Sequence, residues 1–141
     1  MEVSLETLNA YAQSFVGDLP QKPGSGAYVV GLKGDLGAGK TTFVQHVAKI
    51  LGVTETVTSP TFVIAQSYKT THPVFRRLVH VDAYRLHDEE KDTVGFSEYV
   101  SDPHALLLVE WPEYVPGTFP ETALVLNFAT IDENTRTIVH A

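Results

Sequence analysis

The sequence predicts an α/β fold in a single domain, with a mainly parallel β-sheet flanked by helices and an antiparallel hairpin at the C-terminal end. Short apolar runs typical of strands alternate with amphipathic, helix-like segments along most of the chain. A glycine-rich loop joins the first strand-like run to the helix after it, and two alternating runs flank residues 132–134. A length of 141 residues suits one domain with one core, so we expect residues 1–141 to form one unit.

The first half of the chain predicts two helices and the strand between them. Apolar residues at three- and four-residue spacing predict an amphipathic helix over residues 4–16 that ends at Gly17. "AYVVGL", residues 27–32, is short, apolar and β-branched, which is typical of a buried strand. Helical spacing returns in residues 41–51, and Gly52 follows where a glycine commonly ends a helix.

The second half predicts three strands, a helix and the final hairpin. Two of the strands flank a turn, and the third contains a continuous apolar run. The predicted helix has Gly95 in its middle, which lowers its helical propensity. The ranges are 61–68 and 74–82 for the paired strands, 88–100 for the helix, 104–110 for the apolar strand and 122–140 for the hairpin.

Composition narrows the classes of function. Hydrophobic residues make up 43% and charged residues 19%, no apolar run reaches the roughly 18 residues that span a bilayer, and the acidic N-terminus lacks the features of a signal peptide. We therefore expect a cytoplasmic protein. The absence of cysteine excludes disulfides, thiolate metal sites and cysteine catalysis. A net charge of −7 without a visible basic patch disfavours direct, tight binding to tRNA or DNA.

The stretch "GDLGAGKTTF", residues 34–43, contains the phosphate-binding signature G-x-x-x-x-G-K-[ST]. Its glycines let backbone N–H groups turn toward an anion, and Lys40 supplies a positive charge for the β- and γ-phosphates. The Thr41 hydroxyl is a Mg²⁺ ligand of the required kind, at the start of a helix whose dipole favours phosphate. A strand is predicted before the loop and a helix after it, so the sequence predicts a P-loop nucleotide site.

Two acidic residues follow predicted strands and are candidates for handling Mg²⁺ and the attacking water. Asp82 ends "LVHVD" and Glu110 ends "LLLVE". Carboxyl ends of parallel strands lie beside a P-loop, where such carboxylates are required for hydrolysis. Either acid alone also fits a surface residue at the end of a strand.

The segment "TVTSPTF", residues 56–62, is a third candidate. Pro60 favours an extended backbone at Ser59, so the loop enters its strand stiffly. Thr61 would then present its hydroxyl to the γ-phosphate or to Mg²⁺, as a switch loop does. An ordinary connection rich in Ser and Thr is the alternative.

Four motifs, "GDLGAGKTTF", "SPTF", "HVDAYRL" and "LLLVEWPE", occur in this order. In this combination the chain resembles the TsaE family of tRNA threonylcarbamoyladenosine biosynthesis proteins, which are small bacterial P-loop ATPases. The resemblance extends over essentially the whole chain. Alanine in "DAYR" departs from the larger apolar residue that is frequent there, which affects packing more than chemistry.

The resemblance implies MgATP binding and hydrolysis in support of the complex that makes threonylcarbamoyladenosine beside the anticodon. The implied partners are TsaB and TsaD, with TsaD carrying out the transfer and tRNA contacted only indirectly. Hydrolysis would reset the complex between turnovers. The implied roles are phosphate binding for Gly37, Ala38, Gly39, Lys40, Thr41 and Thr42, Mg²⁺ binding for Thr41 and Glu110, a metal-shell or water-orienting role for Asp82, a switch role for Thr61 and an approach to the nucleotide for Arg136.

Rival functions stay open at this point. A small-molecule kinase is the main alternative, although the long irregular stretch over residues 111–121 carries no arginine for a phosphate lid. A GTP-binding switch is less favoured, because no asparagine is followed by lysine as guanine recognition requires. A nucleotide-dependent binding module without hydrolysis is the third possibility. It predicts that Asp82 and Glu110 are dispensable.

Overall fold

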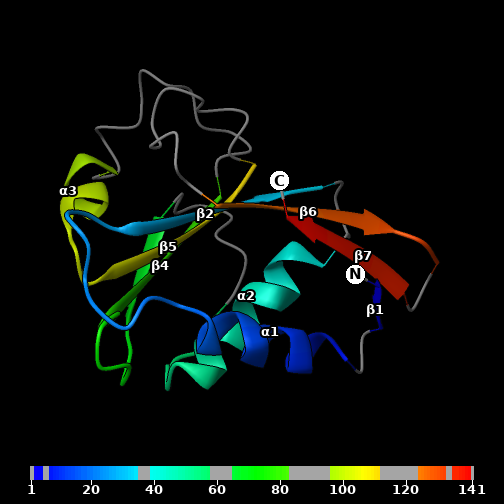
Figure 1. The fold of residues 1–141 in the computed structure, drawn as a ribbon, viewed down its shortest axis with the longest axis horizontal. Coiled ribbons are helices and arrows are strands. Elements are labelled where there is room, and N and C mark those ends of the chain that lie inside the picture. The colour runs from blue at the N-terminus through cyan, green and yellow to red at the C-terminus, as the bar shows by residue number, and fades with distance from the viewer. Residues whose placement is uncertain are drawn as a thin grey trace.

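The computed structural model describes residues 2–4, 7–34, 39–57, 65–82, 96–111, 124–132 and 135–140. In these ranges the chain forms one seven-stranded sheet in the order β1-β7-β6-β2-β5-β4-β3, with helices α1, α2 and α3 (Figure 1). The elements are β1 Glu2–Ser4, α1 Leu8–Gly17, β2 Tyr28–Lys33, α2 Lys40–Ile50, β3 Ala65–Lys69, β4 Arg77–Asp82, α3 Phe96–Ser101, β5 Ala105–Glu110, β6 Leu124–Thr130 and β7 Thr135–His140.

The centre of the sheet is parallel and both of its edges are antiparallel. Strand β2 pairs in parallel with β5 on one side and with β6 on the other, and β5 pairs in parallel with β4. At the edges, β3 runs antiparallel to β4, and β7 runs antiparallel to both β6 and β1. The predicted parallel core and C-terminal hairpin are therefore confirmed.

The N-terminal prediction is wrong in its first residues. The expected helix over residues 4–16 begins only at Leu8, and Glu2–Ser4 instead form β1 against β7. Ser4 and Thr7 hold the turn between strand and helix, because the Ser4 N–H donates to Thr7 Oγ1 at 2.8 Å and the Thr7 N–H donates to Ser4 Oγ at 3.1 Å. A three-residue strand is too short to show a period of two, whereas the helical spacing of α1 is long enough to extend past its true start.

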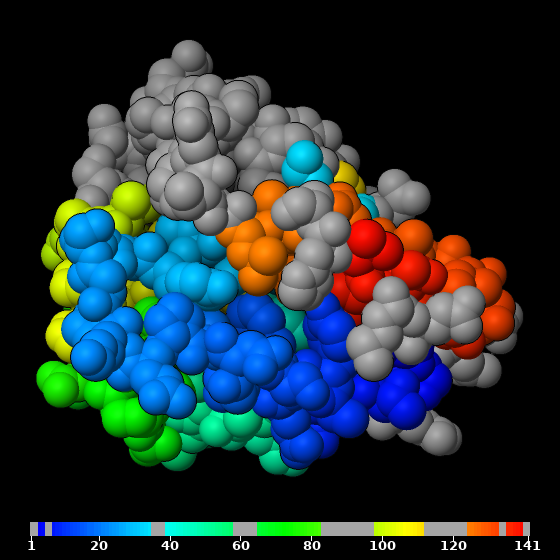
Figure 2. All heavy atoms as spheres, in the orientation of Figure 1, coloured from blue at the N-terminus to red at the C-terminus, as the bar shows by residue number. Residues whose placement is uncertain are grey.

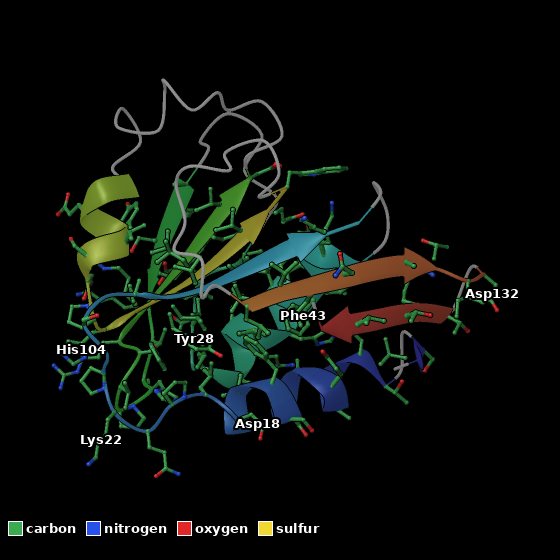
Figure 3. The ribbon with its side chains drawn as sticks, turned by 45° about the horizontal axis from the view of Figure 1, so that its top comes forward. Asp18, Lys22, Tyr28, Phe43, His104 and Asp132 are labelled. Carbon is green, nitrogen blue, oxygen red and sulfur yellow. The ribbon has the colours of Figure 1, made fainter. Side chains whose placement is uncertain are left out.

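Alternation along the strands divides the core into two layers. Leu106 and Leu108 of β5 belong to the larger cluster with α1 and α2, whereas Leu107 and Val109 belong to a smaller cluster on the other face. Phe43 of α2 lies at the centre of the larger cluster, between α1 and the sheet (Figure 3). Its ring is 5.3 Å from that of Phe15 and 5.6 Å from that of Phe128, centroid to centroid, with edge-to-face geometry that favours aromatic pairs.

Helices cover both faces of the sheet. Helices α1 and α2 lie side by side on one face (Figure 1), and Tyr99 and Val100 of α3 pack on the smaller cluster of the other face. In the space-filling view, α1 and the segment after it cover the lower front of the molecule, and the β6–β7 hairpin extends to one side (Figure 2). No helix within the described ranges is long and apolar enough to cross a membrane.

The end of α2 is closed as the sequence predicts. The Gly52 N–H donates to the Lys49 carbonyl at 3.1 Å, and the Val53 N–H donates to the Ala48 carbonyl at 3.0 Å. These two bonds satisfy carbonyl groups that the last helical turn leaves unpaired. The third predicted helix, over residues 88–100, falls partly outside the described residues, and its described part lies in α3.

Candidate nucleotide-binding site

The predicted site lies where the parallel strands end and α2 begins. Strand β2 leads into the glycine-rich loop, and α2 starts at Lys40 on the far side of that loop. The parallel register sets Glu110 opposite Leu32 of β2 on one side and opposite Asp82 of β4 on the other. The sheet therefore brings both predicted carboxylates to the carboxyl ends of its parallel strands, where the loop lies.

Glycine is required at the two described ends of the loop. Gly34 has a φ of 145°, and a Cβ at this position would overlap the carbonyl oxygen of Phe128 on β6. Gly39 has a φ of 98° and caps the N-terminus of α2. Both conformations are rare for residues with a side chain. Gly37 and Ala38, which the sequence assigns to phosphate binding, lie outside the described residues.

Substituting Gly34 with alanine is expected to lower the free energy of unfolding by about 2–5 kcal/mol, because the new Cβ adds both backbone strain and overlap with β6. Denaturant unfolding measures the change. Gly17→Ala is the matched control, since a Cβ there meets no atom within 4 Å and the effect should stay within about 1 kcal/mol. Equal stabilities for the two variants would contradict this account of Gly34.

Lys40 contacts both a backbone carbonyl and an aromatic ring at the end of the loop. Its side chain is buried, with 4% of the residue exposed. The Nζ donates to the Gly34 carbonyl at 2.5 Å and lies 3.4 Å from the centre of the Trp111 ring, a cation–π geometry. Trp111 follows Glu110 directly and has a φ of 62°, and its N–H donates to the Leu32 carbonyl at 3.2 Å. The positive charge is thus fixed between the loop and an aromatic face.

A chain of hydrogen bonds links α2, β5 and β4. The Thr41 hydroxyl lies 3.0 Å from Oε1 and 2.9 Å from Oε2 of Glu110, to which it donates. Oε2 of the same carboxylate lies 2.5 Å from Nε2 of His80. Glu110 is 4% exposed and His80 is 0% exposed, so the carboxylate is held almost entirely by protein donors. The two predicted Mg²⁺ ligands, Thr41 and Glu110, therefore face each other.

Asp82, Thr42 and Arg136, the remaining predicted site residues that the structure describes, lie on three different elements. Asp82 is half-buried at the end of β4, in register with Glu110, and Thr42 is exposed in the first turn of α2. Arg136 of β7 lies next to the loop, since its Cγ is 3.9 Å from the point where a Cβ added to Gly39 would stand. Its Nη1 donates to the backbone carbonyls of Asp132 and Thr135 in the same hairpin.

Thr61 lies outside the described residues, but the start of its segment is described. Val57 is buried in the larger cluster, and its carbonyl accepts a hydrogen bond of 2.8 Å from Nε2 of Gln45 on α2. The switch role of Thr61 stays a prediction, and the start of its segment is hydrogen-bonded to the helix that carries Thr41.

Sequence reasoning assigned a site role to neither His80 nor Trp111. Two signals in the sequence point to them. His80 is two residues before Asp82, so strand alternation puts both on the face that carries Glu110. Trp111 directly follows the acidic end of a strand beside the loop.

The residues present fit a magnesium–nucleotide complex. Mg²⁺ takes hard oxygen ligands, typically from one or two protein groups together with substrate phosphates and water. Thr41 and Glu110 supply a hydroxyl and a carboxylate of this kind, and Lys40 and the α2 N-terminus supply positive charge beside them. The arrangement is suited to binding a polyphosphate with its metal ion.

Known proteins resemble this chain over most of its length. The family model described as "Threonylcarbamoyl adenosine biosynthesis protein TsaE" matches residues 3–138. The Bacillus subtilis protein named tRNA threonylcarbamoyladenosine biosynthesis protein TsaE is 38% identical over 117 residues, which are 83% of this chain and 69% of that protein. The Rickettsia bellii protein of the same name is 36% identical over 133 residues, covering 93% of this chain and 85% of that protein.

A solved structure is similar as well. The crystal structure of Bacillus subtilis YdiB superposes with a TM-score of 0.72 at 30% identity, covering 98% of this chain and 82% of the other. The fold and the sequence thus point to the same relatives. Since the family model spans nearly the whole chain and both relatives exceed 30% identity, the chain belongs to the TsaE family.

Proposed function

We propose that this protein binds MgATP and hydrolyses it to ADP and phosphate in support of the complex that makes threonylcarbamoyladenosine in tRNA. The observation that carries the proposal is the contact between Thr41 at the start of α2 and Glu110 at the end of β5, with Lys40 beside them. Membership of the TsaE family supplies the pathway. The relatives named above carry tRNA threonylcarbamoyladenosine biosynthesis in their names.

Each binding residue has a defined task in this proposal. Lys40 and the backbone of Gly37, Ala38 and Gly39 hold the phosphates, and Thr42 and Arg136 approach them from the first turn of α2 and from β7. Thr41 and Glu110 would hold Mg²⁺, which neutralises charge that develops on the phosphate oxygens. The burial of Lys40 and Glu110 strengthens their electrostatic interactions, because few water molecules screen them.

The catalytic task is to orient a water molecule toward the γ-phosphate. Asp82 and Glu110 end neighbouring strands in register, which supports the proposal that both carboxylates serve one reacting centre. Thr61 is the switch residue in this scheme and orders its segment when the γ-phosphate is present. Glu110 serves both metal and water, and Asp82 supports the water.

Partners complete the activity in our proposal. No sequence motif places an arginine as a finger toward the γ-phosphate, and Arg136, beside the loop, donates its Nη1 to carbonyls of its own hairpin. We therefore expect slow hydrolysis by the protein alone and faster hydrolysis with TsaB and TsaD, in the cytoplasm. The net charge of −7 supports an indirect relation to tRNA, with the partners holding the nucleic acid.

The test is phosphate release from MgATP by the purified protein, alone and with TsaB and TsaD. We expect slow release alone and a rise of at least about 10-fold with both partners, as ordering of a switch by a partner produces. Release that the partners do not change would contradict partner dependence. Phosphate found on a small acceptor instead of in solution would replace the ATPase by a kinase.

A further inference from the structure

His80 is a buried polar residue whose neighbours along β4 and opposite it on β5 are apolar, whereas Gln66 stands opposite it on β3. It lies in β4 between Val79 and Val81, pairs in register with Leu108 of β5, and is 0% exposed. Alternation turns its side chain toward the face of α2, the same face as Leu78. A leucine or valine at this position would continue the pattern of its neighbours, so the histidine calls for a reason other than packing.

The one described partner of the His80 ring is Glu110. Its Nε2 lies 2.5 Å from Oε2 of the carboxylate, and a carboxylate accepts hydrogen bonds, so Nε2 is the donor. Among the residues that the structure describes, no group pairs with Nδ1. Buried nitrogen atoms without a partner are uncommon because they lose their hydrogen bonds to water. Within the described residues the fold therefore tolerates the cost of an unsatisfied Nδ1 atom, while Nε2 of the same ring contacts Glu110.

The contact fixes which way the Glu110 carboxylate faces. Oε2 is shared by His80 from the β4 side and Thr41 from the α2 side, whereas Oε1 is contacted by Thr41. With Oε2 fixed by the ring, rotation of the carboxylate away from α2 would break a short hydrogen bond. Groups that hydrogen-bond a metal ligand in this way orient it and raise metal affinity.

We propose that His80 is a positioning residue that holds Glu110 toward Thr41 and so sets the Mg²⁺ dependence of nucleotide binding; this rests on the proposed MgATP function. His80 does not touch the nucleotide in this scheme. Its effect is exerted through the orientation of one carboxylate. Loss of the Nε2–H donor frees Glu110 to rotate and weakens binding that depends on Mg²⁺, while binding without Mg²⁺ is unchanged.

The experiment compares two substitutions at this position. His80→Leu removes the donor and keeps an apolar side chain of suitable size, whereas His80→Gln places an amide N–H donor near the position of Nε2. Calorimetry measures the affinity for a non-hydrolysable ATP analogue with Mg²⁺ and with EDTA. The ratio of the two affinities is the readout, since general damage to the fold lowers both values.

His104→Leu is the matched control for loss of a structural histidine. Its Nδ1 bonds the Val74 carbonyl at 2.8 Å, and Figure 3 shows it far from the end of the sheet that carries the loop. We expect His80→Leu to reduce the affinity ratio by about 10- to 100-fold, His80→Gln to restore most of it, and His104→Leu to leave it unchanged.

Each other result overturns the proposal. An unchanged ratio in His80→Leu, or equal losses in the leucine and glutamine variants, would show that His80 serves the fold alone. Thermal unfolding of all three variants identifies such a structural role directly. Failure of the unsubstituted protein to bind the analogue with Mg²⁺ would instead overturn the proposed function, and this inference with it.

Discussion

Lys40→Ala is expected to reduce MgATP affinity by about 10- to 100-fold and hydrolysis by about 100- to 1000-fold. Lys40 is a cation fixed directly at the loop, with its Nζ 2.5 Å from the Gly34 carbonyl oxygen. A charged hydrogen bond to phosphate in a shielded site contributes more than a neutral one, because burial limits screening. Calorimetry and phosphate release measure the two effects.

Lys69→Ala is the control for removing a lysine elsewhere. Lys69 is exposed at the end of the edge strand β3, and its loss should change neither affinity nor rate. Circular dichroism must show that Lys40→Ala keeps its fold, since this variant also loses the contact with Trp111. Unchanged nucleotide binding by a folded Lys40→Ala protein would contradict the assignment of the phosphate site.

Glu110→Gln is expected to lower phosphate release by about 100- to 1000-fold while nucleotide still binds. The change removes the negative charge and keeps the shape, so the loop, Lys40 and the start of α2 remain able to hold phosphates. The site then lacks the carboxylate that faces Thr41 at 2.9–3.0 Å. Affinity should fall more with Mg²⁺ than with EDTA, which calorimetry resolves.

Glu98→Gln is the matched control, because Glu98 is an exposed acid in the first turn of α3. Full hydrolysis by Glu110→Gln would contradict the catalytic role of Glu110 and would give Asp82 the main role, which Asp82→Asn tests in the same assay. A protein that binds nucleotide but releases no phosphate, alone or with its partners, would favour the nucleotide-dependent binding module.

The local parts of the site could be predicted from the sequence. The loop, the strand before it and the helix after it form one continuous segment, so the motif and the periodicity of β2 and α2 agree without knowledge of other contacts. The positions of Asp82 and Glu110 at strand ends could be predicted for a similar reason, since each ends a recognisable apolar strand. These features depend on neighbours along the chain.

The contacts between distant segments could not be predicted. The bond between His80 and Glu110 joins residues 30 positions apart, and it depends on the register of β4 against β5. No local pattern specifies that register, or that β1 pairs with β7 at the far edge. Trp111 contacts Lys40 from a backbone conformation that is unusual for tryptophan, with its N–H bonded to the Leu32 carbonyl of β2.

The position of Trp111 also makes intrinsic tryptophan fluorescence a reporter on the loop. It is the single tryptophan of the chain, so all indole emission arises 3.4 Å from the Lys40 ammonium group. A phosphate that draws Nζ away from the ring changes the electric field at the indole. If the protein binds nucleotide as proposed, we expect rapid-mixing fluorescence to follow its arrival and departure in real time, without a label and without altering any residue of the site.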